Sequence, residues 1–340
     1  MAYRCSDLGE RELVRRITGI LGIGERDDCA MVEDGDGWLV WTTDILHRKS
    51  DFPGIATGWQ IGWMAVAVNL SDVAAMGAVP LGLLIAAAIP QDAEVPFAEE
   101  IFRGMNDCAR RYGTRVLGGD LDSADELTLS GTALGWVEKD LVLRRRGARP
   151  KDLLCTTGTL GSAGAGLRVA LEAEGRGEME IGDPDLRALT KRLLLPSPRM
   201  EEGRALALSG AATSMMDNSD GLALSLFDLA EAAGVGFLVQ EDQIPVDPLV
   251  SEVAEGREDA LALALYTGGD FELVFTVRPD LIDRARQACD FAVIGRVLEE
   301  REISIEADGV RRRMEPRGYQ HMKTPKPARL HRSFSSPPQK

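Results

Sequence analysis

Short apolar segments of strand type and of helix type alternate along almost the whole chain, and this alternation limits the folds that the chain can adopt. Apolar and β-branched runs with the length of strands lie at 29–32, 38–42, 81–89, 114–117 and 127–137. Apolar residues at helical spacing lie at 10–21, 56–76 and 97–112. Because alternating strands and helices pack as layers, this order predicts an α/β (α+β) fold.

A basic stretch with glycine and proline, residues 144–150, interrupts the alternation. A second α/β block then runs from Asp152 to about Arg317. We therefore predict two domains, 1–147 and 148–322. The remaining residues, 323–340, contain four prolines and only basic charges, a composition typical of a disordered tail.

An excess of acidic residues argues against one class of partner. The chain has 39 Lys and Arg against 54 Asp and Glu, a net charge of −15, so we expect no nucleic-acid partner. Five scattered cysteines without a C-x-x-C pair and three histidines predict neither a zinc site nor a histidine-rich site. The sequence lacks a signal peptide and any apolar run long enough for a bilayer, so we expect a cytoplasmic protein with no membrane association.

Single aspartates that flank or interrupt apolar segments are the most informative residues. They are Asp28 before a strand, Asp44 after the strand ending at Thr43, Asp72 inside an apolar helix, Asp120 after Gly118-Gly119, and Asp217 and Asp220 within 216–221. Open α/β sheets place ligands at the carboxyl ends of strands, and a carboxylate in an apolar segment is costly unless it is paired or binds metal. Mg²⁺ prefers a few carboxylates together with waters and phosphates. These aspartates therefore predict a magnesium site.

Each feature also has a simpler interpretation. Asp27-Asp28 and Gly118-Gly119-Asp120 could be turns, and Asp217 could cap a helix over 222–232. The glycine-rich stretch 156–166 lacks the G-K-[ST] ending of a phosphate loop, so close helix packing is the favoured reason for its glycines. The run Arg144–Arg146 is either a solvated face or a source of cations for an ATP phosphate.

Taken in order, several segments resemble the thiamine-monophosphate kinase family, which belongs to the superfamily of aminoimidazole ribonucleotide synthetase. The matching segments include GIGERDDCA (22–30), WTTDIL (41–46), AVNLSDVAAMGAVP (67–80), VLGGD (116–120), RRGARPKD (145–152), MDNSDGL (216–222), GGDFELVFTV (268–277) and RGYQH (317–321). The NLSD-x-AAMGA and D-x-SDGL patterns are specific, whereas the glycine turns are not. The resemblance covers essentially the whole chain before residue 323.

The resemblance implies a two-domain aminoimidazole ribonucleotide synthetase-like fold, whose N-terminal sheet pairs across a homodimer, with ATP and several Mg²⁺ ions in the cleft. The implied metal ligands are Asp28, Thr42, Thr43, Asp44, Asp72, Asp120, Asp217 and Asp220. The implied ATP contacts are Gly119, Asp120, Arg145 and Ser219, and the implied substrate contacts are Asp51, Gly269 and Tyr319. Two of these depart from the family pattern: Asp51 stands where the family often has histidine, and Gly269 stands where it has glutamate.

The activity implied by the resemblance is ATP-dependent phosphorylation of thiamine monophosphate to thiamine diphosphate. A phosphate monoester acceptor is already ionised near neutral pH and needs no general base, in line with the lack of a plausible catalytic histidine. We therefore expect direct in-line transfer assisted by Mg²⁺, with charge stabilisation from Arg145 and no phosphoenzyme. Two alternatives stay open: another ATP-using enzyme of the superfamily with a different small phosphorylated or amide substrate, and a catalytically silent nucleotide-binding regulator.

Overall fold

The computed structural model describes residues 4–24 and 26–322, which divide into two compact units. The smaller unit, from the described residues of 1–24 and 320–340, contains α1 (Cys5–Leu8) and the predicted amphipathic helix α2 (Glu10–Leu21). Within it, the backbone N–H of His321 donates to Glu10 at 2.8 Å. The predicted tail, 323–340, lies outside the described residues.

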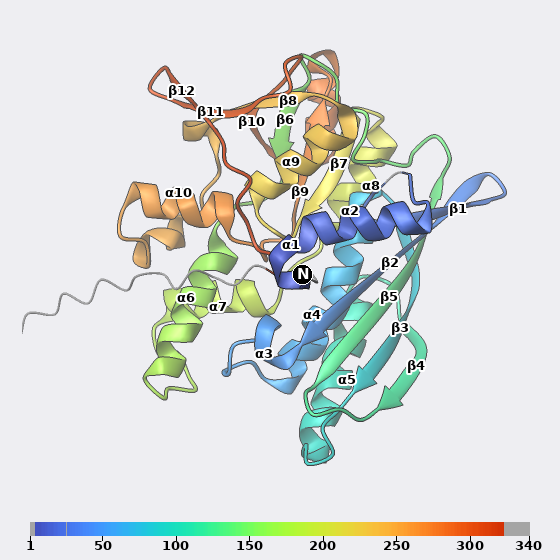
Figure 1. The fold of residues 1–340 in the computed structure, drawn as a ribbon, viewed down its shortest axis with the longest axis vertical. Helices are drawn as coiled ribbons and strands as arrows, with labels where there is room; N and C mark the ends of the chain where they lie inside the picture. Colours follow the sequence, from blue (N-terminus) through green and yellow to red (C-terminus); the bar gives the residue numbers. More distant parts are fainter. Residues whose placement is uncertain (1–3, 25, 323–340) are drawn as a thin grey trace, which may run out of the picture. The chain divides into compact units, whose positions relative to one another are not determined.

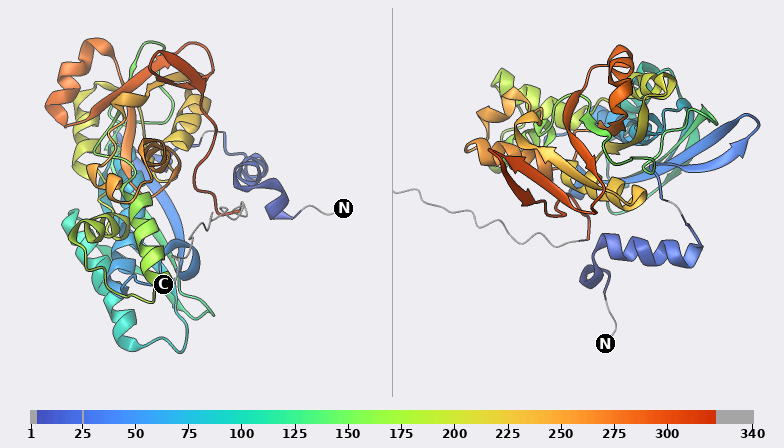
Figure 2. Two further views of the ribbon diagram at one scale, coloured as in Figure 1. Left: turned by 90° about the vertical axis from the view of Figure 1, so that its left-hand side faces the viewer. Right: turned by 90° about the horizontal axis from the view of Figure 1, so that it is seen from above.

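The larger unit, within 25–319, contains two sheets with helices packed on them (Figure 1). In the side view the seven-stranded sheet occupies the upper half of this unit and the five-stranded sheet the lower half (Figure 2, left). This arrangement confirms the predicted α/β fold. The stretch 144–150 lies between the last strand of one sheet and the first strand of the other, and the division into 1–147 and 148–322 stays a prediction.

The five-stranded sheet has the order β1-β2-β5-β3-β4, in which only the β3–β4 pair is parallel. Its strands are β1 (Ala30–Asp34), β2 (Gly37–His47), β3 (Val79–Ala88), β4 (Val116–Asp122) and β5 (Thr128–Glu138). A short helix, α3 (Arg48–Asp51), follows β2 directly. Two strands run further than the sequence predicts, because β5 pairs with β2 as far as His47 and β3 pairs with β4 as far as Asp122.

Two helices, α4 (Gly58–Ala75) and α5 (Val95–Arg111), pack closely against each other beside this sheet, and α4 contacts its inner face. A Cβ at Gly62 would lie 1.8 Å from the carbonyl oxygen of Ile101, and one at Gly104 would lie 1.9 Å from that of Trp59. The helices therefore cross at backbone contact, which only glycine permits. This crossing fixes α4, the helix that carries Asp72.

The opposite face of the five-stranded sheet is apolar and exposed. The large side chains on it include Val32, Trp41, Ile45, Leu84 and Leu117, which are 39% to 54% exposed. Contiguous apolar surface of this kind marks an interaction site more often than a solvated face.

The seven-stranded sheet has the order β12-β11-β8-β10-β6-β9-β7. Its strands are β6 (Leu153–Thr156), β7 (Ala212–Asn218), β8 (Gly236–Gln240), β9 (Glu272–Val277), β10 (Ala292–Leu298), β11 (Ile303–Ala307) and β12 (Val310–Arg313). Its helices are α6 (Ser162–Gly175), α7 (Pro184–Leu194), α8 (Met200–Ser209), α9 (Leu222–Ala233), α10 (Arg257–Tyr266) and α11 (Ile282–Ala288), with short 3-10 turns at Glu241–Gln243, Pro248–Glu252 and Pro279–Leu281. None of the helices in the described residues is both long and apolar enough to cross a bilayer.

Candidate functional site

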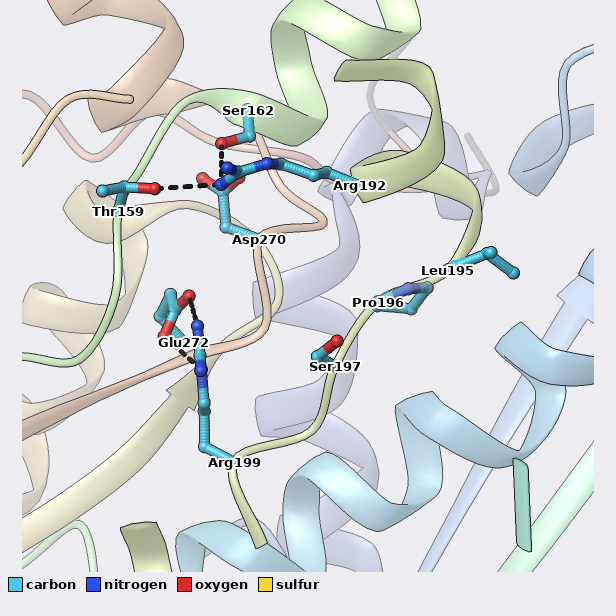
Figure 3. Close-up of a pocket in the computed structure, with 9 residues that line it drawn as sticks. All are labelled: Thr159, Ser162, Arg192, Leu195, Pro196, Ser197, Arg199, Asp270 and Glu272. Carbon is cyan, nitrogen blue, oxygen red and sulfur yellow. Dashed lines mark hydrogen bonds and ion pairs between the residues drawn. The ribbon is translucent and has the colours of Figure 1, made fainter. Parts of the chain in front are cut away.

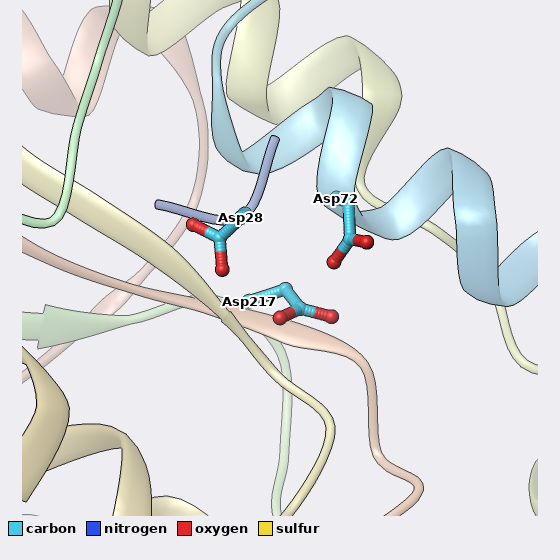
Figure 4. A group of neighbouring side chains, drawn as sticks. All are labelled: Asp28, Asp72 and Asp217. Atoms are coloured by element: carbon cyan, nitrogen blue, oxygen red, sulfur yellow. The ribbon is translucent and has the colours of Figure 1, made fainter. Parts of the chain in front are cut away.

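Three of the predicted aspartates meet where the two sheets approach each other. Asp28 comes from the segment before β1, Asp72 from α4, and Asp217 from the end of β7 (Figure 4). One carboxylate oxygen from each lies within 4.8 Å of the others. Residues from three distant parts of the sequence thus form one compact acidic cluster, which we name the Asp28–Asp72–Asp217 cluster.

Burial opposes ionisation of the carboxyl groups in this cluster. Burial raises the pKa of Asp72 well above its ordinary range, and the neighbouring charges of Asp217, Asp44 and Asp28 raise it further. Burial, with a contribution from Asp28, raises the pKa of Asp217 from 3.8 to about 8. Carboxylates that resist ionisation this strongly need a cation nearby, and a divalent metal ion is the usual one.

The chemistry of the donor atoms fits such a cation. Oδ2 of Asp28 is buried and has no hydrogen-bond partner among the residues that the structure describes, although buried polar atoms almost always have one. Three hard carboxylate oxygens within 4.8 Å of one another match the ligand preference of Mg²⁺.

Neighbouring hydroxyl groups orient two of the carboxylates. Ser71 donates to Oδ2 of Asp217 at 2.7 Å, and the hydroxyl of Thr42 donates to Oδ2 of Asp72. Thr42 is a predicted site residue, whereas Ser71 was not predicted. Its one signal in the sequence was its position beside Asp72 within an apolar helical segment.

A second unpredicted residue, Asn69, connects α4 to the strand that carries Asp44. Oδ1 of Asn69 accepts from the backbone N–H of Asp44 at 3.3 Å, and Nδ2 donates to the carbonyl of Ala65 at 3.0 Å. A Cβ at Gly131 would lie 2.3 Å from Nδ2, so glycine leaves the room that the amide occupies. Asn69 thereby links β2 to α4 and fixes the position of the Asp44 backbone relative to that helix.

The basic run 144–146 reaches this cluster and is not merely a solvated face. Arg145 donates to Oδ1 of Asp28 through Nε at 3.1 Å and Nη2 at 2.6 Å, and Arg144 binds Asp27 at 2.6 Å. Asp27 also accepts from the backbone N–H of Arg145 at 2.7 Å. Two arginines thus bind the Asp27-Asp28 pair, and a simple turn would not need these ion pairs.

Two strand-end predictions were wrong. Asp44 lies inside β2, and Asp120 lies inside β4, because strand pairing continues past both residues. The capping interpretation of Asp217 was also wrong, because the N-cap residue of helix α9 is Gly221.

Asp120 and Gly119 lie far from the cluster in the same chain. The row of paired residues through Asp44 runs through Gly131, Ile85 and Gly119, so Gly119 lies three strands away from β2. At the usual strand spacing this separation is about 14 Å. The structure therefore does not bring these two predicted residues to the three carboxylates.

Asp120 and Thr43 also belong to the other face of the sheet. Asp120 shares its row with the exposed Ile45, and successive residues of a strand point to opposite faces. The hydroxyl of Thr43 donates to the carbonyl of Gly131 at 2.8 Å and accepts from Thr132 at 3.2 Å. Both side chains thus face away from α4.

The remaining predicted residues lie in loops. The carbonyl of Ser219 accepts from Gly269 N–H at 2.8 Å, and the carbonyl of Asp220 accepts from Tyr319 N–H at 3.0 Å. Oδ2 of Asp51 accepts from the backbone N–H of His47 at 2.7 Å, so Asp51 closes the turn of α3. The segment that carries Asp217, Ser219 and Asp220 is therefore hydrogen-bonded to Gly269 and Tyr319. Both are residues that we predict to contact the substrate.

A cavity of about 190 Å³ is lined in part by Asp270, the residue that follows Gly269 (Figure 3). It is lined by Thr159, Ser162, Arg192, Leu195, Pro196, Ser197, Arg199, Asp270 and Glu272. Both arginines are paired, Arg192 with Asp247 and Arg199 with Glu272. Asp270 accepts from the backbone N–H groups of Gly161 and Ala163, at 2.7 and 2.9 Å, and burial raises its pKa to about 7. Among the described residues, Asp270 is therefore a lining carboxylate without a cationic partner.

The glycine-rich stretch 156–166 serves packing, as the favoured interpretation predicts. A Cβ at Gly164 would lie 2.2 Å from the side chain of Thr267, and one at Gly166 would lie 2.3 Å from the carbonyl of Leu189. Helix α6 thus approaches its neighbours through its glycines.

Comparison with known proteins gives the family. The model of the AIR synthase related protein N-terminal domain matches residues 26–137, and that of the C-terminal domain matches 149–308. A thiamine-monophosphate kinase of Methanospirillum hungatei is 40% identical over 315 residues, which are 92% of this chain and 99% of that protein. The chain belongs to the thiamine-monophosphate kinase family. Another thiamine-monophosphate kinase, from Pyrococcus horikoshii, is 33% identical over 87% of this chain and 90% of its own.

Solved structures agree with this membership of the thiamine-monophosphate kinase family. A structure described as AaThiL complexed with AMPPCP and TMP superimposes with a TM-score of 0.86 at 30% identity, over 94% of this chain and 99% of that chain. The thiamine monophosphate kinase of Aquifex aeolicus gives 0.79 at 29% identity, over 89% and 98%. A HypE–HypF complex gives 0.72 at 22% identity over 89% of this chain and 99% of that chain, which shows a shared fold alone.

Proposed function

We propose that this chain transfers the γ-phosphoryl group of ATP directly to thiamine monophosphate and so forms thiamine diphosphate. The Asp28–Asp72–Asp217 cluster carries this proposal, because it lies in a chain that matches thiamine-monophosphate kinases over most of its length. A relative with the same fold has been solved with an ATP analogue and TMP, which supports ATP and thiamine monophosphate as the two substrates.

The three carboxylates would hold Mg²⁺, which when bound neutralises the charge of the phosphate groups. Ser71 and Thr42 keep the carboxylates of Asp217 and Asp72 in a fixed orientation, so that no reorganisation is needed as charge develops. Arg145 lies at the cluster through its contacts with Asp28 and adds a guanidinium whose geometry suits phosphate.

A direct transfer agrees with the side chains around the cluster. Burial, and then the charge of Asp72, raises the pKa of the Cys29 thiol well above its ordinary value, so the thiol stays protonated and does not act as a nucleophile. The imidazole Nδ1 of His47 is in hydrogen-bond contact with the hydroxyl of Thr128 at 3.0 Å. Neither residue supports a phosphoenzyme.

We propose the other roles by resemblance to the family. Further metal ligands are Thr42, Thr43, Asp44, Asp120 and Asp220; the ATP contacts are Gly119, Asp120, Arg145 and Ser219. The substrate contacts are Asp51, Gly269 and Tyr319, and the cavity lined in part by Asp270 is proposed to receive the rings of the acceptor (Figure 3).

The position of Asp120 supports a homodimer. Asp120 and Thr43 face away from the cluster of their own chain, on the side of the apolar sheet face that carries Ile45 and Leu84. In a two-fold dimer the same face meets itself, so each chain can offer Asp120 to the site of its partner. We therefore propose that this face is the dimer interface and that each complete site contains residues of two chains.

Complementation between inactive variants tests the shared site. Asp72→Asn and Asp120→Asn should each be inactive as pure proteins. Mixed dimers contain one site with both changes and one with neither, and random pairing makes half of the dimers mixed. Unfolding and refolding the two proteins together should restore about a quarter of wild-type activity. Recovery of no activity, with mixed dimers verified by differential tags, would contradict the shared site.

The activity itself is tested with γ-labelled ATP, Mg²⁺ and either thiamine monophosphate or thiamine. Label should appear in thiamine diphosphate, and thiamine should be a poor acceptor because its neutral hydroxyl must lose a proton to attack, whereas the monophosphate is already ionised. Stable label on the protein, or equal use of thiamine, would show that the proposed reaction is wrong.

A further inference from the structure

Three segments of the chain meet around the loop that carries Asp217, Ser219 and Asp220. The backbone N–H groups of Gly269 and Phe271 donate to the carbonyls of Ser219 and Asn218, at 2.8 and 3.1 Å. The N–H of Tyr319 donates to the carbonyl of Asp220 at 3.0 Å. The loop is therefore hydrogen-bonded to both segments, 268–271 and 317–319.

The contact at Gly318 is too close for any other residue. A Cβ at this position would lie 2.5 Å from the carbonyl oxygen of Asp220 and 2.5 Å from Cδ1 of Leu224. The leucine side chain can turn away, but the backbone oxygen of Asp220 cannot, so a methyl group must push the loop and the segment apart. Gly318 has no positive φ, and the effect of a substitution is therefore one of contact and not of backbone strain.

An aromatic contact holds the same segment from the side of α10. The guanidinium carbon of Arg317 lies 4.5 Å from the ring centroid of Tyr266, the last residue of that helix, and Arg317 also lies 3.9 Å from Glu315. Cation–π contacts of this geometry stabilise an arrangement modestly when they are near the surface. Figure 1 shows the red C-terminal segment passing α9 and α10.

We propose that Arg317 and Gly318 are positioning residues that hold Asp220 in place for Mg²⁺–ATP, with Tyr266 as their anchor. In this proposal the segment acts through the carbonyl of Asp220. The segment also carries Tyr319, whose backbone N–H is hydrogen-bonded to the carbonyl of Asp220. This inference rests on the proposed function, which assigns Asp220 to the metal.

The test measures binding and not turnover: titration calorimetry of Mg²⁺ with a non-hydrolysable ATP analogue. Gly318→Ala should weaken binding at least about tenfold, the usual effect of losing a group that orients a metal ligand. The matched control is Gly182→Ala, since a Cβ there would meet nothing within 4 Å and binding should be unchanged. Unchanged binding in Gly318→Ala, with or without a lower Tm, overturns the inference.

A second pair of variants keeps the test decisive if Gly318→Ala does not fold. Tyr266→Phe keeps the ring and should bind as the wild type does, whereas Tyr266→Leu should bind about threefold more weakly. Equal binding by the two variants overturns the inference. A wild-type chain that binds the analogue but transfers no phosphate to thiamine monophosphate would refute the proposed function and leave this comparison valid.

Discussion

Replacing Asp72 with asparagine is expected to lower kcat by about a thousandfold or more while leaving the chain folded. The amide keeps the size of the side chain and can still accept from Thr42, but it provides no negative charge for a metal ion. Burial and the charges of Asp217, Asp44 and Asp28 oppose the ionised form of Asp72, so the substitution also removes repulsion. The variant should therefore have a Tm no lower than that of the metal-free wild type.

The control for this substitution is Asp125→Asn, which changes an exposed aspartate in the loop before β5. Its kcat should match the wild type. Activity of Asp72→Asn within tenfold of the wild type at saturating Mg²⁺ and ATP would show that Asp72 is a structural charge.

Removal of Mg²⁺ is expected to stop the reaction outright and to lower the Tm. The pKa of Asp217 in the folded chain is raised from 3.8 to about 8, so between these values the folded state holds more protons than the unfolded state. The stability of the metal-free protein should therefore fall as the pH rises toward 8. A bound metal ion removes this penalty and competes with protons, so its stabilising effect should grow over the same range.

Thermal unfolding with EDTA or with Mg²⁺, at pH 6 and at pH 8, measures this effect. The rise in Tm caused by Mg²⁺ should be larger at the higher pH, and smaller in Asp72→Asn than in the wild type at both. A metal-induced shift that is independent of pH and identical in the two proteins would mean that Mg²⁺ binds elsewhere.

The sequence was sufficient for the features that depend on a single segment. Asp72 could be predicted because a carboxylate inside an apolar helix needs a partner. The packing role of the glycines in 156–166 was favoured because the stretch lacks the G-K-[ST] ending of a phosphate loop. The strands and helices were found because their apolar periodicity is local. Their ends were less accurate, since pairing with β5 and β3 extends β2 and β4 beyond their apolar cores.

Features that depend on pairs of distant segments could not be predicted. Ser71 is 146 positions from Asp217 in the sequence, and Arg145 is 117 positions from Asp28. Local apolar periodicity contains no information about either contact. The place of Asp120 required the register of three strand pairs, which decides both its distance from Asp44 and the face on which it lies. The sequence therefore suggested that all the implied ligands form one site. In the structure they are divided between the two faces of the five-stranded sheet.

The crossing of α4 and α5 has a consequence for anyone who wishes to make this protein more heat-resistant. Exchange of helical glycine for alanine is a standard route to higher stability, because alanine restricts the unfolded chain and favours the helix. At Gly175, where a Cβ would meet nothing within 4 Å, the rule can be applied. At Gly62 and Gly104 the same exchange would drive two helix backbones apart and displace Asp72, so a search guided by helix propensity alone would choose substitutions that damage the site.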